Sequence, residues 1–234
     1  MCAANSPKSV ISFNFKDGSV DLQELNRAWD IALEDALLDL THDSKVSSFL
    51  IAGVRLGLQH RKISARSVAV LSGYSLSTFF RSFHSVEHFI EKGFFLVNSL
   101  VIKIYRKHVN NQPLTLSEHV DLFLTICVGA YAAYPPDILQ HMSDKYYGDI
   151  KKIHPHNKEL SMALLMCLHK QDATIGLQIY PEELEELLAM LDGNLMQTAL
   201  RRDGMLTKPH YFEFLHKILY GFLMLCCNKD VAVV

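Results

Sequence analysis

Hydroxyl groups and two guanidinium groups lie in the range 64–85. Ser75, Ser77 and Thr78 stand close together, and Arg81 follows them. Groups of these kinds hydrogen-bond the base edges and phosphate oxygens of DNA. The stretch therefore predicts DNA contacts if the chain presents these side chains on one surface.

Two short helices that meet at a steep angle would position these side chains, and three residues have the spacing that such a pair needs. Ala69 is small enough to stand where the two helices touch. Gly73 tolerates the positive φ of a sharp turn. Phe79 closes a small core from the second helix. The spacing predicts a helix-turn-helix whose second helix enters the major groove of DNA.

The polar residues around this motif also have ordinary structural interpretations. Ser64 and Ser85 are expected to cap helices, and a capped helix N-terminus can also bind phosphate, so both roles are compatible. Arg61, Lys62 and Arg66 lie around the start of the first helix. They are either phosphate ligands or solvated surface charges.

A second motif with possible chemistry is HSVEH, from His84 to His88, which matches the HxxEH pattern of some zinc peptidases. That chemistry needs both histidines on one continuous helix. Ser85 is expected to cap the helix, which leaves His84 outside it. His154-Pro-His156 is expected to be a polar loop. We therefore predict no enzyme, no catalytic or metal-binding residue and no cofactor.

The composition is that of a folded protein with room for two units. The chain has 234 residues, of which 49% are apolar and 21% charged, and its mean hydropathy is +0.10. These values supply a large core and exclude a disordered chain. The formal net charge is −2, so any basic surface must be local.

The five cysteines predict a reducing compartment. They are odd in number, no CxxC occurs, and Cys226 and Cys227 are adjacent. The range Met1–Lys8 has no leader pattern, which indicates the cytoplasm. The apolar run Ile218–Cys227 is far shorter than the roughly 20 residues of a membrane span. We expect a soluble protein with no membrane contact.

Apolar residues recur with a helical rather than an alternating period along most of the chain. We predict an all-α fold, in which an N-terminal helix-turn-helix unit of three helices joins a larger helical domain for ligand binding and dimerisation. The predicted domains are an extension with one helix (1–42), a helix-turn-helix DNA-binding domain (43–88) and the larger domain (89–234). The pattern predicts helices at about 19–40, 46–58, 64–72, 76–83, 85–109, 117–134, 136–147, 157–172, 181–202 and 208–227.

The motif and the order of the helices resemble the tetracycline-repressor (TetR) family of bacterial regulators. Motif-level similarity covers about residues 46–109, and the rest is similar only in helix pattern. The matching residues are Val68-Ala69, Ser72-Gly73-Tyr74-Ser75, Ser77-Thr78-Phe79-Phe80-Arg81-Ser82-Phe83 and Ser85-Val86-Glu87.

The resemblance implies a sequence-specific transcriptional regulator, a repressor, in the bacterial cytoplasm at the nucleoid. It implies a homodimer on a palindromic double-stranded DNA operator, released when a small apolar effector binds. The residues expected to contact DNA are Ser64, Arg66, Tyr74, Ser75, Leu76, Ser77, Thr78, Phe80, Arg81 and Ser85.

Two further residue sets are predicted on the later helices. A mostly apolar ligand pocket, whose members could equally be ordinary core, is expected to be lined by Phe94, Phe95, Asn98, Cys127, Tyr131, Met162, Met166 and His169. A four-helix bundle between two subunits is expected to contain Leu184, Leu188, Leu191, Leu195, Leu215, Leu219 and Phe222.

Two other functions compete with the regulator. In this family the position of Phe80 is usually Tyr, and the position of Val86 is usually basic, so two phosphate-binding groups are replaced here. These departures favour a helical scaffold or partner-binding protein that kept the fold and lost DNA binding. The other competing function, an enzyme that uses the HxxEH residues, has no supporting pattern elsewhere in the sequence.

Overall fold

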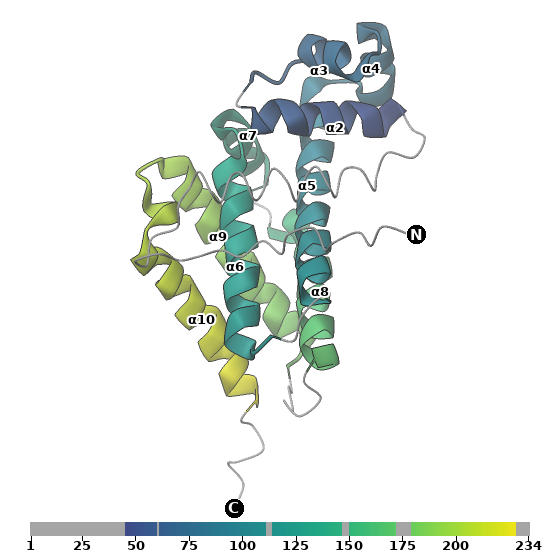
Figure 1. Cartoon of the computed structure of the whole chain (residues 1–234). Helices are drawn as coiled ribbons and strands as arrows, with labels where there is room; N and C mark the ends of the chain where they lie inside the picture. Colours follow the sequence, from purple (N-terminus) through teal and green to yellow (C-terminus); the bar gives the residue numbers. More distant parts are fainter. Residues whose placement is uncertain (1–44, 60, 111–113, 147–149, 172–178, 228–234) are drawn as a thin grey trace, which may run out of the picture.

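The structure is a computed structural model of the chain, and it describes residues 45–59, 61–110, 114–146, 150–171 and 179–227 (Figure 1). All regular secondary structure in these residues is helical, which confirms the predicted all-α class. The predicted extension 1–42, with its helix at 19–40, lies outside the described residues.

The helices lie close to the predicted ranges, with one exception. Helix α8 begins at Ile150 rather than near residue 157, so His154 to His156 belong to a helix and not to the predicted loop. Pro155 therefore lies within α8, after its first turn. The bounds are α2 (Lys45–Leu58), α3 (Ala65–Ser72), α4 (Leu76–Phe83), α5 (Val86–Val109), α6 (Leu116–Ala133), α7 (Pro136–Tyr146), α8 (Ile150–Gln171), α9 (Pro181–Arg201), the 3-10 turn η2 (Met205–Thr207) and α10 (Pro209–Cys227).

Local signals in the sequence fix several of these bounds. Before α6, the Thr115 hydroxyl accepts from the Glu118 backbone N–H at 3.3 Å, and the Glu118 carboxylate accepts from the Thr115 N–H at 2.7 Å. This reciprocal pair satisfies two N–H groups at the start of the helix. Helix α9 begins with Pro181, whose missing N–H costs nothing there. It ends at a turn where Arg202 and Gly204 have φ of 53° and 72°.

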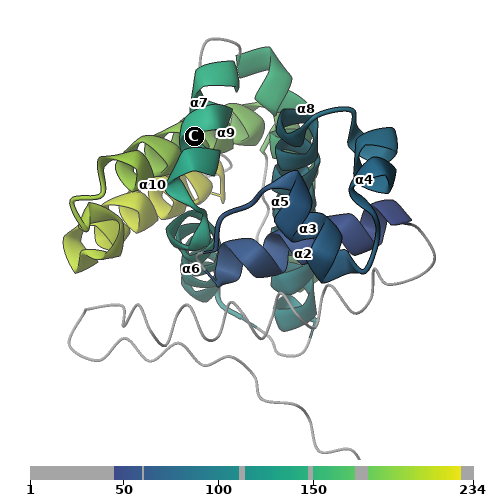
Figure 2. The same cartoon turned by 90° about the horizontal axis from the view of Figure 1, so that it is seen from above.

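The helices form two groups that are joined by α5. Helices α2, α3 and α4 gather at one end of the molecule, with α2 lying across the upper part of α5 (Figures 1 and 2). Helix α5 then runs away from this end between α6 and α8, while α9 packs on α8 and α10 packs on α6 (Figure 1). We call α2–α4 the three-helix unit and α5–α10 the larger helical unit.

Each group has its own hydrophobic core. The core of the three-helix unit contains Phe49, Val68, Phe79 and Phe83, and Phe89 joins it from the first turns of α5. The core of the larger helical unit is built from the inner faces of α5 to α10, and Ile51 of α2 joins it. Burial of apolar surface drives the packing of both groups.

Candidate nucleic-acid interface

The turn between α3 and α4 has the geometry that the sequence predicted. Gly73 has a φ of 75°, in the left-handed region that favours glycine. The Tyr74 N–H donates to the Ala69 carbonyl at 3.1 Å, which closes the end of α3. Ala69 is 4% exposed, as expected for a small residue at a helix contact.

Helix α4 is fixed to its neighbours by a cluster of aromatic rings. Phe79 is fully buried, and its ring centroid lies 5.5 Å from that of Phe49 on α2, with the rings nearly perpendicular. Phe83 lies 5.0 Å from Phe89, again edge to face. Such edge-to-face pairs stabilise a core beyond simple burial. One side of α4 is therefore fully used for packing.

The opposite side of α4 presents hydroxyl and guanidinium groups. Ser75, Ser77 and Arg81 are exposed. The Ser75 hydroxyl accepts from the Thr78 N–H at 3.2 Å and caps the helix, and it also pairs with the Ser77 and Thr78 hydroxyls at 2.9 and 2.8 Å. Thr78 is half-buried and belongs to this cap. The exposed hydroxyls at the start of α4 are thus held in one cluster.

The predicted phosphate-binding serines are both caps. The Ser64 hydroxyl accepts from the Ser67 N–H at 3.1 Å, and the Ser85 hydroxyl accepts from the His88 N–H at 3.1 Å. Beside Ser64, a surface hollow of about 770 Å³, solvent at its mouth included, is lined by Arg61 and Arg66. The N-terminus of α3 and the two arginines together form a positive region.

The charge of this end of the chain differs from that of the whole. The range 45–88 contains six Lys or Arg and one acidic residue, Glu87, whereas the full chain has 23 basic and 25 acidic residues. Within the described residues, no ion pair neutralises Arg66 or Arg81. The three-helix unit is therefore a basic surface on an acidic protein, a contrast that the sequence contained but that the overall charge concealed.

The same end also carries exposed apolar side chains, and only some of them were predicted to contact DNA. Val70 is 76% exposed, Leu71 and Leu76 are each 44% exposed, and Phe80 is 43% exposed. Tyr74 is 37% exposed beside them. We call these five residues the apolar patch. Tyr74, Leu76 and Phe80 were predicted DNA contacts, and the patch extends them onto α3.

The structure brings together only some of the residues predicted to line a ligand pocket. Phe94, Phe95 and Asn98 line a small cavity, where α9 adds Asp192. Met162 and Met166 are 39% and 59% exposed on the outer face of α8, contrary to the prediction. The buried face of that helix is formed instead by Ala163, Leu164, Leu165, Cys167 and Leu168. The side chain of His169 lies outside the described part of the structure.

Cys127 and Tyr131 are buried on α6, close to Asp192. The Tyr131 hydroxyl donates a hydrogen bond to the Asp192 carboxylate. Burial raises the pKa of Asp192 to about 6, and the hydrogen bond from Tyr131 acts in the opposite direction. Asp192 was not predicted, because its sequence neighbours give no sign that a helix distant in sequence would cover it.

The HSVEH motif does not form a helical zinc-binding pair. His84 has a φ of 62° and ends α4, whereas His88 lies in α5. The two rings are stacked with their centroids 6.1 Å apart, and His88 Nδ1 pairs with the Phe83 carbonyl oxygen at 2.7 Å. Among the described residues, no group of three His, Cys, Asp or Glu side chains could hold a metal ion.

Most of the predicted dimer-interface residues are core residues of the single chain. Six leucines are at most 5% exposed within the larger helical unit, and only Phe222 remains partly exposed. They are buried because α9 packs against α8 and α7, and α10 against α6. The prediction is therefore corrected for Leu184, Leu188, Leu191, Leu195, Leu215 and Leu219.

No single helix in the described ranges is long and apolar enough to cross a membrane. Only α6 and α7 taken together reach the required length and composition, and they are bent by 104°. Comparison with known proteins adds no assignment: no family model matches this sequence, and no curated protein matches it either.

Proposed function

We propose that this chain is a sequence-specific transcriptional regulator that reads DNA with α4. The observation that carries the proposal is the division of α4 into two faces. Phe79 and Phe83 hold one face in the aromatic core, while Ser77 and Arg81 stay exposed on the other. A second helix anchored in this way can place polar side chains against base edges in the major groove. The resemblance to the TetR family supports the same helix-turn-helix role.

The charge distribution supports phosphate contacts around α4. The six basic residues in 45–88 stand against one acidic residue. Arg66 at the start of α3 and Arg81 on α4 are exposed. Positive groups and helix N-termini bind the DNA backbone and fix its register, and they make the affinity dependent on salt.

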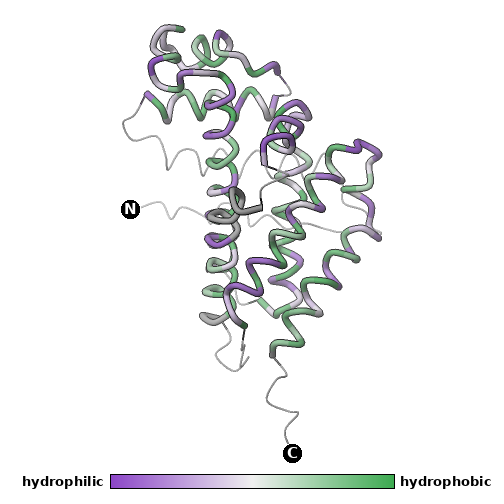
Figure 3. Tube along the Cα trace, turned by 180° about the vertical axis from the view of Figure 1, so that it is seen from behind, coloured by the Kyte–Doolittle hydropathy of each residue, from purple (hydrophilic) through white to green (hydrophobic). Residues whose placement is uncertain are grey.

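A homodimer on a palindromic operator is part of the proposal. Its subunit interface is a different surface from the one predicted from the sequence. Helix α10 buries Leu215, Leu219 and Leu223 inside the chain, and Figure 3 shows that hydrophobic residues continue along most of its length. Phe214 and Leu225 on the same helix are 51% and 73% exposed. We propose that this exposed apolar surface packs against its symmetry mate, which would set two copies of α4 on successive half-sites of one operator.

Control by a small apolar effector completes the proposal. Helix α5 runs from the three-helix unit into the larger helical unit and is the natural lever between them (Figure 1). An effector changes DNA affinity only if it binds the two arrangements of that lever with different affinity. We propose repression that ends when the effector binds, in a bacterial cytoplasm at the nucleoid.

Selection of bound sequences from a random double-stranded DNA library tests the proposal. The full-length chain is expected to enrich a palindrome, and its affinity for that site is expected to fall steeply as salt rises. Binding with no sequence preference would leave a DNA-binding protein but overturn the operator. Failure to bind any duplex at low salt would overturn the regulator.

A helical partner-binding protein is the second candidate, and the apolar patch favours it. Val70 and Leu71 are exposed apolar residues of α3, and Phe80 is an exposed apolar residue of α4. Exposed apolar surface of this kind often marks a protein contact. A chain that binds no DNA at low salt would be assigned this role. Replacement of Leu71 by Glu would then be expected to abolish partner capture without changing the helical content.

A further inference from the structure

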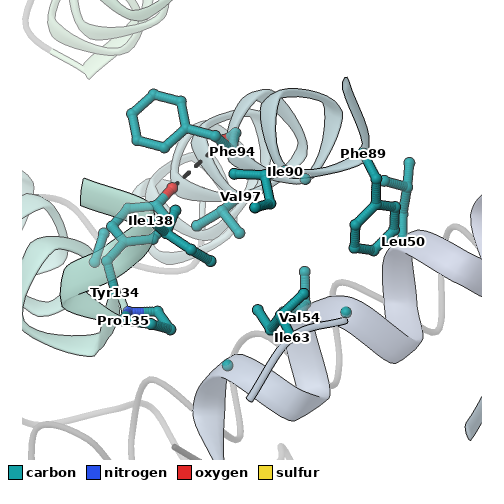
Figure 4. Close-up of a pocket in the computed structure, with 14 residues that line it drawn as sticks. Leu50, Val54, Ile63, Phe89, Ile90, Phe94, Val97, Tyr134, Pro135 and Ile138 are labelled. Atoms are coloured by element: carbon teal, nitrogen blue, oxygen red, sulfur yellow. Dashed lines mark hydrogen bonds between the residues drawn. The ribbon is translucent and has the colours of Figure 1, made fainter. Parts of the chain in front are cut away.

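An apolar cleft lies at the seam between the two groups of helices. Helix α2 forms one wall, α5 forms the opposite wall, and the junction of α6 with α7 closes one end (Figure 4). The space amounts to about 530 Å³ when the solvent at its open mouth is included. Leu50 and Val54 face Ile90 and Val97 across it (Figure 4).

The lining of the cleft is chemically uniform. Among the described residues that line it, none is charged, and the one hydroxyl belongs to Tyr134. That hydroxyl already donates to Asn98 Oδ1 at 3.2 Å and to the Phe94 carbonyl oxygen at 3.4 Å. A charged ligand would lose its hydration here without gaining a partner, which is costly. The occupant must therefore be neutral and mostly hydrocarbon.

Three glycines shape the space, and they differ in what surrounds them. A Cβ on Gly53 would meet the Phe89 ring at 2.3 Å, so that part of the cleft is already filled. A Cβ on Gly57 would touch Pro135 at 3.6 Å. A Cβ on Gly93 would meet no atom of the described residues within 4 Å. The cleft is therefore open at Gly93, and a side chain at that position would enter it.

Apolar side chains around the cleft are left partly in contact with water. Leu50, Val54, Ile63 and Ile90 are each only half-buried although they line a concave surface. An apolar molecule in the cleft would remove this surface from water, and the open mouth gives it a route of entry. No side chain in the described part of the structure fills this concave apolar surface next to α2 and α5.

We infer that this cleft is a binding site for a neutral, largely hydrocarbon small molecule held between α2 and α5. The site is distinct from the pocket predicted from the sequence, with which it shares only Phe94. Its occupant touches the three-helix unit directly, through Leu50 and Val54. The consequence for DNA rests on the proposed function: a molecule wedged here changes how α2 sits on α5, and with it the position of α4.

Fluorescence titration with N-phenyl-1-naphthylamine, a neutral aromatic probe, tests the site in the full-length protein without DNA. The wild-type chain is expected to bind it saturably, at one molecule per chain. Gly93→Leu, whose side chain occupies the open space, is expected to weaken binding by about tenfold or more. Gly93→Ala is the matched control, because it changes the backbone in the same way and leaves most of the space open.

A second measurement on the wild-type protein keeps the test independent of how the variants fold. Nuclear Overhauser contacts from the probe to the methyl groups of Ile90 and Ile138 are expected, because both residues line the cleft. Absence of saturable binding, equal binding by Gly93→Leu and wild type, or contacts only to isoleucines elsewhere would each overturn the site. Probe binding by a chain that binds no DNA would instead overturn the regulator and leave the site in place.

Discussion

The Tyr131 hydroxyl on α6 donates a hydrogen bond to the Asp192 carboxylate on α9, so two helices distant in sequence share one half-buried acid. The Asp192 pKa lies near 6, above the usual value of 3.8, because burial disfavours the ionised form. Between these two values the folded state holds a proton that the unfolded state releases. Asp192 therefore lowers stability as the pH rises through this window.

Asp192→Asn is expected to stabilise the protein at pH 7.5, by about 1–3 kcal/mol, since the amide removes a buried charge and its oxygen still accepts from Tyr131. The gain should shrink as the pH falls from 6 to 4, where the wild-type carboxyl becomes neutral. Thermal melts of both proteins across this range measure it. A gain that stays constant with pH would show that ionisation of Asp192 is not the cause.

Arg81→Ala is expected to weaken DNA binding without unfolding, because Arg81 is exposed and lies off the buried face of α4. A phosphate contact should lower affinity for all sequences alike and reduce the salt slope by about one. Ser77→Ala is the companion variant, and loss of a base contact should cost about 1–3 kcal/mol at one position of the operator. Thr78 is less suitable, since its hydroxyl belongs to the Ser75 cap.

Phe80→Tyr and Val86→Lys restore two groups that the TetR family usually has, and together they are expected to tighten DNA binding. Phe80 is 43% exposed, so a hydroxyl on its ring can reach solvent or phosphate. Val86 is half-buried, and the aliphatic stem of a lysine can cover the same surface while its ammonium group stays in water. Gel-shift titration compares the double variant with wild type; unchanged affinity would mean that α4 docks in another way.

Substitutions on α10 should separate assembly from folding. Phe214→Glu with Leu225→Glu places charges on the exposed apolar face and is expected to give a folded monomer by light scattering. Leu219→Glu is expected to unfold the larger helical unit, because Leu219 is fully buried and its charge would have no partner. A dimer that survives the double substitution would place the interface elsewhere.

Gly53→Ala is expected to destabilise the protein by about 1–3 kcal/mol, because its Cβ would stand 2.3 Å from the Phe89 ring. That ring is 3% exposed and is packed against Phe79 and Phe83, so it has little room to move. Gly193→Ala on α9 is the matched control, since nothing lies within 4 Å of its Cβ position. The control should stabilise by about 0.4–1 kcal/mol in chemical denaturation.

The sequence was sufficient for features that depend on near neighbours. Helix period, the serine caps at Ser64 and Ser85, and the turn at Gly73 are all set within a few residues, and each was found where predicted. The small core around Phe79 was equally readable, because its spacing is short.

Features that depend on which distant helix covers which face could not be predicted in this way. Leu188 and Phe214 are both apolar residues of late helices, yet one is core and the other is exposed. Met166 occupies a helical face that no described helix covers, whereas Asp192 is half-buried and hydrogen-bonded to Tyr131 on α6. Residue type alone would place Leu188 and Phe214 alike, and it would bury Met166 and expose Asp192. Only tertiary packing determines which face of each helix is covered.

The presence of two hydrophobic cores determines how the effects of amino-acid substitutions on stability combine. Among the partly buried apolar residues that the structure describes, only Ile63 and Ile90 pack against both cores, and Ile51 of α2 belongs to the larger one. Val68 and Leu188 belong to different cores, so the free-energy changes of substitutions at these two positions should be additive. Each core can therefore accumulate changes without compensation from the other, which lets one half of the molecule diverge while the other half stays the same.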